Sequence, residues 1–404
     1  MVDVSIKVVA STTDNTVLTM RLSVFLIIGS AGLCAAILMS PVMLNQVFNG
    51  RDYIDHTNFA QNMLQSGTLQ TPHFLWHLLV TLFNKIFPSS FSVSALIVAL
   101  LSYALLGSII AYNLHNRIVG HVSKTRNAWL TLFSMGSILI AAPITLLWPL
   151  DRHLYFGYIG INVYHNPTVT LLKPIALMSF MLIVQSAQVK HISFTYILTS
   201  ILITVAAALS KPNYSILLIP VLPVFSLYVY LARKNIRSVY YSLIIIASTI
   251  MIIAWQYTFT YSSGGQSSIA FAPFDVASHY SSFLGIKFFL SVAFPLLVTI
   301  CYWRRVFCSF EMLLSWLLFL CGAVLTYFFT ETGSRQYDGN FFWSGQIGLF
   351  ILFFSSTMFM IEQYLQSSKR LCLRFILLGL VFSLHLLSGL FFYYAELLYP
   401  SWYW

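Results

Sequence analysis

The sequence predicts an all-α, polytopic membrane protein, and three observations support this fold class. Only 8% of the 404 residues are Asp, Glu, Lys or Arg, whereas about a quarter are charged in a typical soluble domain. The mean hydropathy is +0.81, and 58% of the residues are hydrophobic. The apolar residues form runs of about 20, the length that a helix needs to cross the hydrocarbon core of a bilayer.

These runs define the elements in order. A window of about 20 residues divides the chain into about eleven spans. They cover residues 21–44, 91–113, 127–149, 167–188, 192–209, 213–232, 238–259, 283–303, 310–330, 343–362 and 374–397. Residues 1–20 are polar and weakly basic, which predicts a cytoplasmic tail ahead of an uncleaved anchor. Residues 21–404 then form a single transmembrane domain.

The distribution of basic residues predicts the orientation. With the N-terminus in the cytoplasm, fourteen Lys and Arg residues lie on the cytoplasmic side and seven lie on or near the outer side. The positive-inside rule therefore favours a cytoplasmic N-terminus and an outer C-terminus. The net charge of +10 follows from these short loops, so it does not indicate a nucleic-acid partner. The five cysteines include no CxxC pair and imply neither a disulfide framework nor a zinc site.

In this orientation the first outer loop, about residues 45–90, contains the densest group of polar side chains. Asp52, Asp55 and His56 lie within five positions, and residues three or four apart share one face of a helix. A carboxylate in this group can act as general base on an acceptor hydroxyl, with the imidazole orienting it or the substrate. The alternative interpretation is a solvated loop that caps the following helix.

The same loop continues into an aromatic-rich segment, Pro72 to Phe87. A run of about 16 residues is short for a span and is typical of a helix in the headgroup region. His73 and His77 are four positions apart, a spacing that can hold a metal. No third ligand is evident, so interfacial packing is favoured. The sequence implies no cofactor, and a divalent metal remains an open alternative.

The second outer loop, about residues 149–167, holds two further candidates for substrate binding. Arg152 can bind a phosphate through its bidentate guanidinium. His165 begins the segment His165-Asn166-Pro167-Thr168 and can add a polar contact to a donor. The alternative is that this segment only caps the next span, since Asn166 precedes a proline suited to the first helical turn.

Three more cations are phosphate candidates. Lys173 lies a few residues inside a span, and Lys211 lies at the outer junction of two spans. Charges at these depths usually snorkel or pair, and they mark functional sites by default. An outward-facing lysine can hold a phosphate as a point charge, and Arg335 in the last outer loop can do so in bidentate geometry. A structural role at the helix junction is the alternative for Lys211.

The order of these features resembles the GT-C superfamily, the integral-membrane glycosyltransferases that use polyprenyl-phosphate-linked sugars. The similarity covers about residues 20–235. It includes an outer loop with Asp52-Tyr53 and His56 after the first span, a juxtamembrane segment that begins Pro72-His73, and a Lys-Pro pair at Lys211-Pro212.

This resemblance implies a membrane glycosyltransferase with about eleven spans and juxtamembrane helices in its first outer loop. Asp52 is then the first candidate for the general base and Asp55 the second, while Lys211 or Arg335 stabilises the charge on the leaving phosphate. The partners are a polyprenyl-phosphate sugar, a glycan, lipid or protein acceptor, and membrane lipids. The expected location is the bacterial inner membrane, with the active site on the periplasmic side.

Two other classes of membrane protein remain as alternatives. An O-antigen-type polymerase or ligase of lipid-linked glycans is expected to use arginines in large outer loops. Here the outer loops contain only Arg51, Arg152 and Arg335. A lipid or glycan flippase without enzymatic activity is expected to have internal repeats and polar residues at the membrane midplane. The sequence shows no clear repeat, and its polar residues gather towards one surface.

Overall fold

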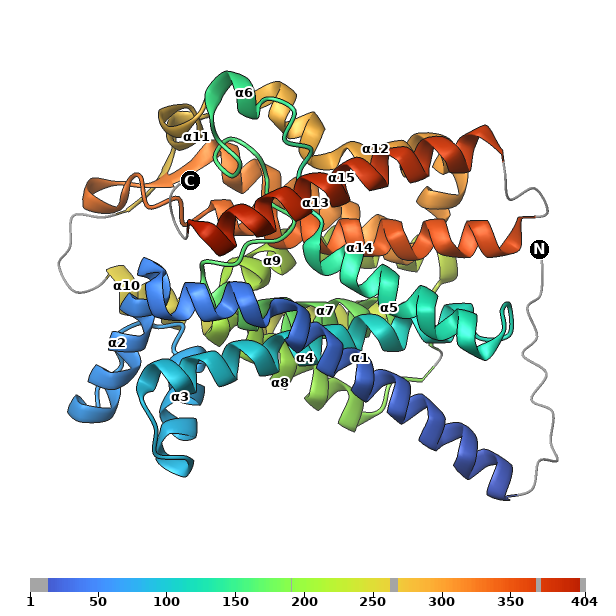
Figure 1. Ribbon diagram of the computed structural model, residues 1–404, viewed down its shortest axis with the longest axis horizontal. Helices are drawn as coiled ribbons and strands as arrows, with labels where there is room; N and C mark the ends of the chain where they lie inside the picture. Colours follow the sequence, from blue (N-terminus) through green and yellow to red (C-terminus); the bar gives the residue numbers. More distant parts are fainter. Residues whose placement is uncertain (1–13, 190, 262–267, 368–371, 400–404) are drawn as a thin grey trace.

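The structure is a computed structural model that describes residues 14–189, 191–261, 268–367 and 372–399, and it is built almost wholly of helices (Figure 1). The longer helices are α1 (Asp14–Asn49), α4 (Phe91–Ile118), α5 (Lys124–Ile140), α7 (Pro167–Ser186), α8 (Phe194–Ser210), α9 (Asn213–Arg233), α10 (Ile236–Tyr261), α12 (Leu284–Cys308), α13 (Phe310–Phe328), α14 (Phe342–Gln366) and α15 (Leu373–Leu398). The shorter ones are α2 (Arg51–Ser66), α3 (Leu75–Ile86), α6 (Trp148–Asp151), α11 (Asp275–Tyr280) and the 3₁₀ turn η1 (Gly333–Arg335).

Within the described residues, nine helices are long and apolar enough to cross a membrane. This confirms the all-α, polytopic membrane class. The predicted spans 127–149 and 192–209 correspond to α5 and α8, which have only 17 residues each. Both helices end near a proline. Residues 141–145 ahead of α6 are not helical and include Pro143, and Lys211 ahead of Pro212 is extended, as steric clash with a following proline ring favours.

The first predicted boundaries also shift. Helix α1 begins at Asp14, inside the segment 1–20 that the sequence predicts as a tail, and it continues to Asn49 instead of ending at residue 44. Residues 1–13 of that tail lie outside the described residues. The loop at 45–90 contains two helices, α2 and α3. The helix predicted in the aromatic-rich segment is therefore confirmed.

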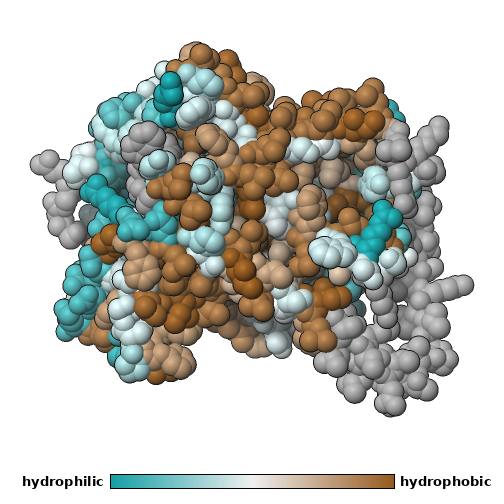
Figure 2. All heavy atoms as spheres, in the orientation of Figure 1, coloured by the Kyte–Doolittle hydropathy of each residue, from teal (hydrophilic) through white to brown (hydrophobic). Residues whose placement is uncertain are grey.

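The long helices lie side by side and give the bundle two ends (Figure 1). The end at the left of the view carries α2, α3 and α11, and we call it the loop end. The start of α7 also lies there, because Asn166 contacts Asp52 of α2. Hydrogen bonds between polar residues join the start of α7 to the last turn of α8, and the start of α9 to the start of α14. Hydrophobic residues cover much of the middle of the face in Figure 2, and hydrophilic residues gather towards the left end.

Small residues let two helix pairs approach closely, as in many membrane bundles. A Cβ atom on Gly32 of α1 would lie 2.4 Å from the Ser108 hydroxyl of α4. A Cβ atom on Gly322 of α13 would lie 2.4 Å from the Ser344 carbonyl oxygen of α14. The second contact fixes the first turn of α14, which carries Trp343, at the loop end.

A small antiparallel sheet joins two of the predicted outer loops. Strand β1 (Ile269–Phe271) pairs with β2 (Phe329–Glu331), with Ile269 opposite Glu331. The Glu331 carboxylate accepts hydrogen bonds from the Tyr261 hydroxyl at 2.5 Å and from the Asn340 amide. The loop after α10 and the loop before α14 therefore form one connected cover at the loop end.

Candidate active site

Helix α2 separates the two candidate carboxylates. Asp52 and His56 are half-buried and one turn apart, so they share the inward face of the helix. Buried Tyr53 and Thr57 anchor the same side. The Asp55 side chain is 55% exposed, and its carboxylate lies 3.9 Å from the Arg51 guanidinium. The geometry thus places Asp52 at the inward-facing position and leaves Asp55 at the surface.

Asn166 joins Asp52 to the start of α7. Its side-chain Nδ2 donates to Asp52 Oδ2 at 3.0 Å. Its Oδ1 accepts from the Val169 backbone N–H at 3.1 Å and from the Thr168 hydroxyl at 2.7 Å, so Asn166 is the N-cap of α7. The predicted cap is confirmed, and the same amide also fixes the position of the Asp52 carboxylate.

Lys211 approaches this cap from the end of α8. Its Nζ lies 3.5 Å from Asn166 Oδ1, 3.3 Å from the Thr168 hydroxyl and 4.6 Å from the centre of the Trp343 ring. No carboxylate of the described residues lies within 4 Å of this ammonium. Burial lowers the pKa of Lys211 to about 8, and the negative charge of nearby Asp52 opposes the shift. Lys211 is therefore a buried cation with only weak, neutral partners.

His165 and two aromatic rings complete the group. The His165 ring lies 5.5 Å from the Trp343 ring and 5.3 Å, edge-on, from the Tyr155 ring. Burial lowers the pKa of His165 to about 4, with the charge of Asp52 opposing and that of Lys211 reinforcing the shift. His165 is therefore neutral near pH 7. We call the set Asp52, His56, His165, Asn166, Thr168 and Lys211 the polar cluster.

Three histidines gather behind Asp52. His56 Nδ1 lies 2.8 Å from His77 Nε2, and the His56 and His73 rings are 6.4 Å apart. Burial lowers the pKa of His77 to about 4 and holds that of His56 well below its usual range. These rings are therefore neutral near pH 7. Within the described residues, no group of three or more His, Cys, Asp and Glu side chains has an arrangement that could hold a metal ion.

Arg335 lies at the edge of the cluster. Its Nε is 3.2 Å from Glu331 Oε2 and 3.7 Å from Asp338 Oδ2, and its side chain is 39% exposed. The pKa of His73 is lowered first by burial and then by the charge of Lys211, and the charge of Arg335 also contributes. Arg335 is thus close enough to act on the cluster electrostatically, although its own charge is largely compensated.

The structure keeps the other two predicted phosphate ligands apart from the cluster. The exposed Arg152 guanidinium lies over the Trp148 ring at 5.3 Å. Lys173 is 2% exposed, and its ammonium donates to Asn162 Oδ1 at 2.9 Å. It follows Asn166 by seven residues, or about 10 Å along α7. Within the part of the chain that the structure describes, neither cation has a hydrogen bond or an ion pair with Asp52 or Lys211.

Another buried lysine was not among the predicted site residues. Lys287 of α12 is 0% exposed; its ammonium is paired with Asp151 and donates to the Ser281 hydroxyl at 2.6 Å and the Phe156 carbonyl at 2.9 Å. Its position just inside a predicted span was a signal for a partner at the loop end. The contacts of Trp343 with Lys211 and of Asn166 with Asp52 had no comparable signal in the sequence. Tryptophan is also common in interfacial belts and asparagine in helix caps, so neither residue type pointed to the site.

Comparison of the chain with models of known protein families and with curated proteins finds no match. The polar cluster combines a half-buried carboxylate with a buried ammonium that has no carboxylate in contact. Such a pair can accept a proton at one point and stabilise a developing negative charge at another.

Proposed function

We propose that this protein is a membrane glycosyltransferase that moves a sugar from a polyprenyl phosphate to an acceptor hydroxyl. The observation that carries the proposal is the buried Lys211 ammonium, which has no carboxylate within 4 Å, near the Asn166-bound Asp52 carboxylate. A carboxylate suits the acceptor proton, and the ammonium suits the phosphate of the leaving group. The resemblance of about residues 20–235 to the GT-C superfamily supports the same class.

The transfer is a direct displacement in which atoms and charge balance. Asp52 removes the proton from the acceptor hydroxyl as that oxygen attacks the anomeric carbon. The bond between the anomeric carbon and the phosphate oxygen breaks, and its electron pair leaves with the polyprenyl phosphate. Lys211 stabilises that growing negative charge, an electrostatic effect that is strong where water is excluded. Asn166 is a positioning residue for both groups.

The surroundings of Lys211 favour an anion. Helices α7 and α9 both begin beside it, at Pro167 and Asn213. The dipole at a helix start attracts negative charge, and the start of α9 has no side-chain cap on its N–H groups. The neutral histidines and Trp343 leave Lys211 without a competing carboxylate in contact. A phosphate would therefore supply the partner that this ammonium lacks.

An apolar groove near the loop end offers a place for the prenyl chain. It has a volume of about 370 Å³ and lies between α12 and α13. Phe274, Phe288 and Tyr327 line it together with other apolar residues. The strand β2 follows α13 directly and leads to Arg335. We propose that the prenyl chain lies in this groove, in contact with the lipid.

The finer topology belongs to the same proposal. We count α5 and α8 with the nine longer helices as eleven spans. We also propose that the fold is GT-C-like and that the loop end lies on the periplasmic side of a bacterial inner membrane. Lys and Arg are more numerous in the loops of the opposite end, which supports this orientation through the positive-inside rule.

A transfer assay in membranes tests the proposal. Radiolabelled polyprenyl-phosphate sugars are supplied to wild type, to Asp52→Asn and to the matched control Asp55→Asn, which makes the same change on the exposed face of the same helix. Loss of a general base is expected to lower the rate by about 10²–10⁴-fold, whereas the control should stay within about twofold of wild type because an exposed ion pair contributes little.

The possible results separate the alternatives. Equal activity in Asp52→Asn and wild type, at equal expression, would exclude Asp52 as the base. Loss in Asp55→Asn alone would move the base to the exposed carboxylate. Polymerised glycan as the product of wild type would favour the polymerase class, and movement of the lipid-linked sugar across vesicles without transfer would favour a flippase.

A further inference from the structure

A second polar site lies at the end of the bundle opposite the polar cluster. It is a pocket of about 530 Å³ formed by the last turns of α12 and α14 and the first turn of α15. We call it the arginine pocket, after Arg304, Arg305 and Arg374 in its lining. Trp343 of the cluster region and Gln363 of the pocket are twenty residues apart on α14. They are therefore separated by about 30 Å, the thickness of a bilayer core.

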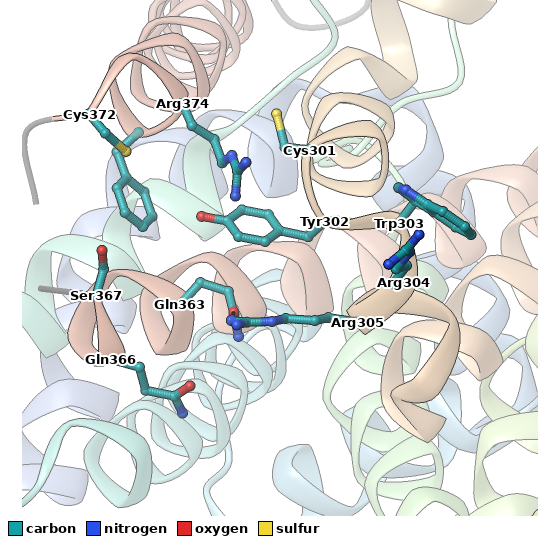
Figure 3. Close-up of a pocket in the computed structure, with 11 residues that line it drawn as sticks. Cys301, Tyr302, Trp303, Arg304, Arg305, Gln363, Gln366, Ser367, Cys372 and Arg374 are labelled. Atoms are coloured by element: carbon teal, nitrogen blue, oxygen red, sulfur yellow. Dashed lines mark hydrogen bonds between the residues drawn. The ribbon is translucent and has the colours of Figure 1, made fainter. Parts of the chain in front are cut away.

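The side chains converge on the ring of Tyr302 (Figure 3). The Arg374 guanidinium lies 4.8 Å from the centre of that ring, and the Arg305 guanidinium donates to Gln363 Oε1. Figure 3 shows Arg374 and Arg305 on two sides of Tyr302, while Trp303 and Arg304 lie together to one side. Two guanidinium groups from different helices thus face one space.

A break in α12 produces this arrangement. Tyr302 has φ −132° and ψ 28°, which are not helical values, so the helix changes direction there. The residues that follow, Trp303 to Arg305, therefore leave the axis of the preceding turns.

The charges of the pocket are unbalanced. Within the described residues, no carboxylate lies within 4 Å of any of the three arginines. Arg117 at the same end is different, since it pairs with Glu311 at 2.5 Å and Glu362 at 2.9 Å. The fold therefore compensates Arg117 and leaves the three arginines of the pocket without a carboxylate in contact. Guanidinium groups bind phosphate in bidentate geometry and strongly favour an anion as partner.

We propose that the arginine pocket binds the phosphate group of an anionic phospholipid. The rim of the pocket supports a lipid over a soluble ligand. Ile300, Trp303 and Leu373 beside the arginines are exposed apolar side chains, and Leu373 is 71% exposed. Acyl chains can cover these residues while the headgroup occupies the pocket, as in basic pockets between helices that hold anionic lipids. This proposal is independent of the reaction at the polar cluster.

Lipid binding by the purified full-length protein tests the proposal. The protein in detergent is titrated with phosphatidylglycerol, with phosphatidylcholine and with inorganic phosphate, and bound lipid is counted by native mass spectrometry. The pocket variant Arg305→Gln/Arg374→Gln is compared with Arg233→Gln/Lys234→Gln. The control also removes two positive charges, from the C-terminus of α9, which lies at the same end of the bundle as the arginine pocket.

The expected result is a selective loss. Phosphatidylglycerol affinity should fall about tenfold or more in the pocket variant, the effect of losing a charge-assisted hydrogen bond, and should change little in the control. The variant Arg305→Lys/Arg374→Lys keeps the charge and should bind with intermediate affinity, because an ammonium lacks the bidentate fork. Equal losses in the pocket and control variants would overturn the proposal, since they would show only the general attraction of a basic surface.

A second readout keeps the test valid if the pocket variants fold poorly. Cys301 and Cys372 line the pocket, whereas Cys308 is exposed and does not. In the wild-type protein, phosphatidylglycerol should slow maleimide labelling of Cys301 and Cys372 relative to Cys308. If inorganic phosphate protects the two cysteines and phosphatidylglycerol does not, the pocket binds phosphate from a soluble ligand and the lipid proposal is wrong. Equal labelling rates with and without either ligand would overturn the site.

Discussion

Lys211 and Lys287 are both buried near the loop end, but their surroundings differ. The Lys287 ammonium has three acceptors for its three protons, and one of them is the Asp151 carboxylate. Lys211 has two long hydrogen bonds to neutral oxygens and the face of Trp343. A buried charge without a paired partner is costly. The difference indicates that Lys287 stabilises the fold, and it underlies the proposal that Lys211 binds an anion.

The largest effect is expected from removal of the Lys287–Asp151 ion pair. Lys287→Met leaves the Asp151 carboxylate buried without its cation, which should cost about 3–5 kcal/mol of stability. Thermal unfolding in detergent measures the loss. The double variant Lys287→Met/Asp151→Asn should recover most of it, because no charge is then left unpaired. A stable Lys287→Met protein would contradict the structural role.

The next effect concerns Lys211. Lys211→Met removes a cation that has no carboxylate in contact, so the unfolding temperature should stay the same or rise. Transfer of sugar should fall by about 10²–10³-fold, the usual effect of removing one group that stabilises transition-state charge. The two lysines would then show opposite patterns in one pair of assays. Loss of stability in Lys211→Met, with activity per folded molecule unchanged, would reverse the comparison.

A smaller effect tests the support behind Trp343. Gly322→Ala places a methyl group 2.4 Å from the Ser344 carbonyl oxygen, so α13 and α14 must move apart. Overpacking of this kind should cost about 1–3 kcal/mol, and displacement of Trp343 should raise the KM for the donor. Gly379→Ala in α15 is the control, because its Cβ atom would meet nothing within 4 Å. Equal unfolding temperatures for the two variants would argue against the close contact.

The smallest expected effect is a dependence of activity on pH that comes from Lys211. Burial lowers the pKa of Lys211 to about 8, so the ammonium is charged below that pH and neutral above it. The value of kcat/KM for the phosphate donor should therefore fall about tenfold per pH unit above pH 8, since this ratio reports ionisation of the free enzyme. Lys211→Arg stays charged and should lose this decline. A decline of equal slope in Lys211→Arg would assign the ionisation to another group.

Much of the fold followed from the sequence because span length and hydropathy depend on local composition. The apolar runs predicted the long helices, and the aromatic-rich segment 72–87 predicted the helix found as α3. A helix around Asp52 entered only as the condition under which Asp52, Asp55 and His56 share one face, and α2 fulfils it. The span count was less predictable. Hydropathy does not register Pro143, near which α5 ends at Ile140 instead of at residue 149. The predicted span 192–209 already had the short length of α8.

The site was predictable only in part. Asp52, His56, His165 and Lys211 stood out as polar residues in an apolar chain, and the structure brings them together at the loop end. The same signal also selected Arg152, Lys173 and Asp55, which lie elsewhere. A rare charge shows that a partner is needed, but the identity of the partner depends on residues far away along the chain.

The sequence by itself determined the membrane class, the length of most helices and the short list of polar residues, because each follows from local hydropathy and composition. Only the tertiary structure decided that Lys287 is paired with a carboxylate and that Lys211 has no carboxylate in contact. Asp151 reaches Lys287 across 136 positions, while Asn166 holds Asp52 across 114. Such pairings are set by helix packing, in which contacts such as Gly322 against Ser344 bring distant segments together.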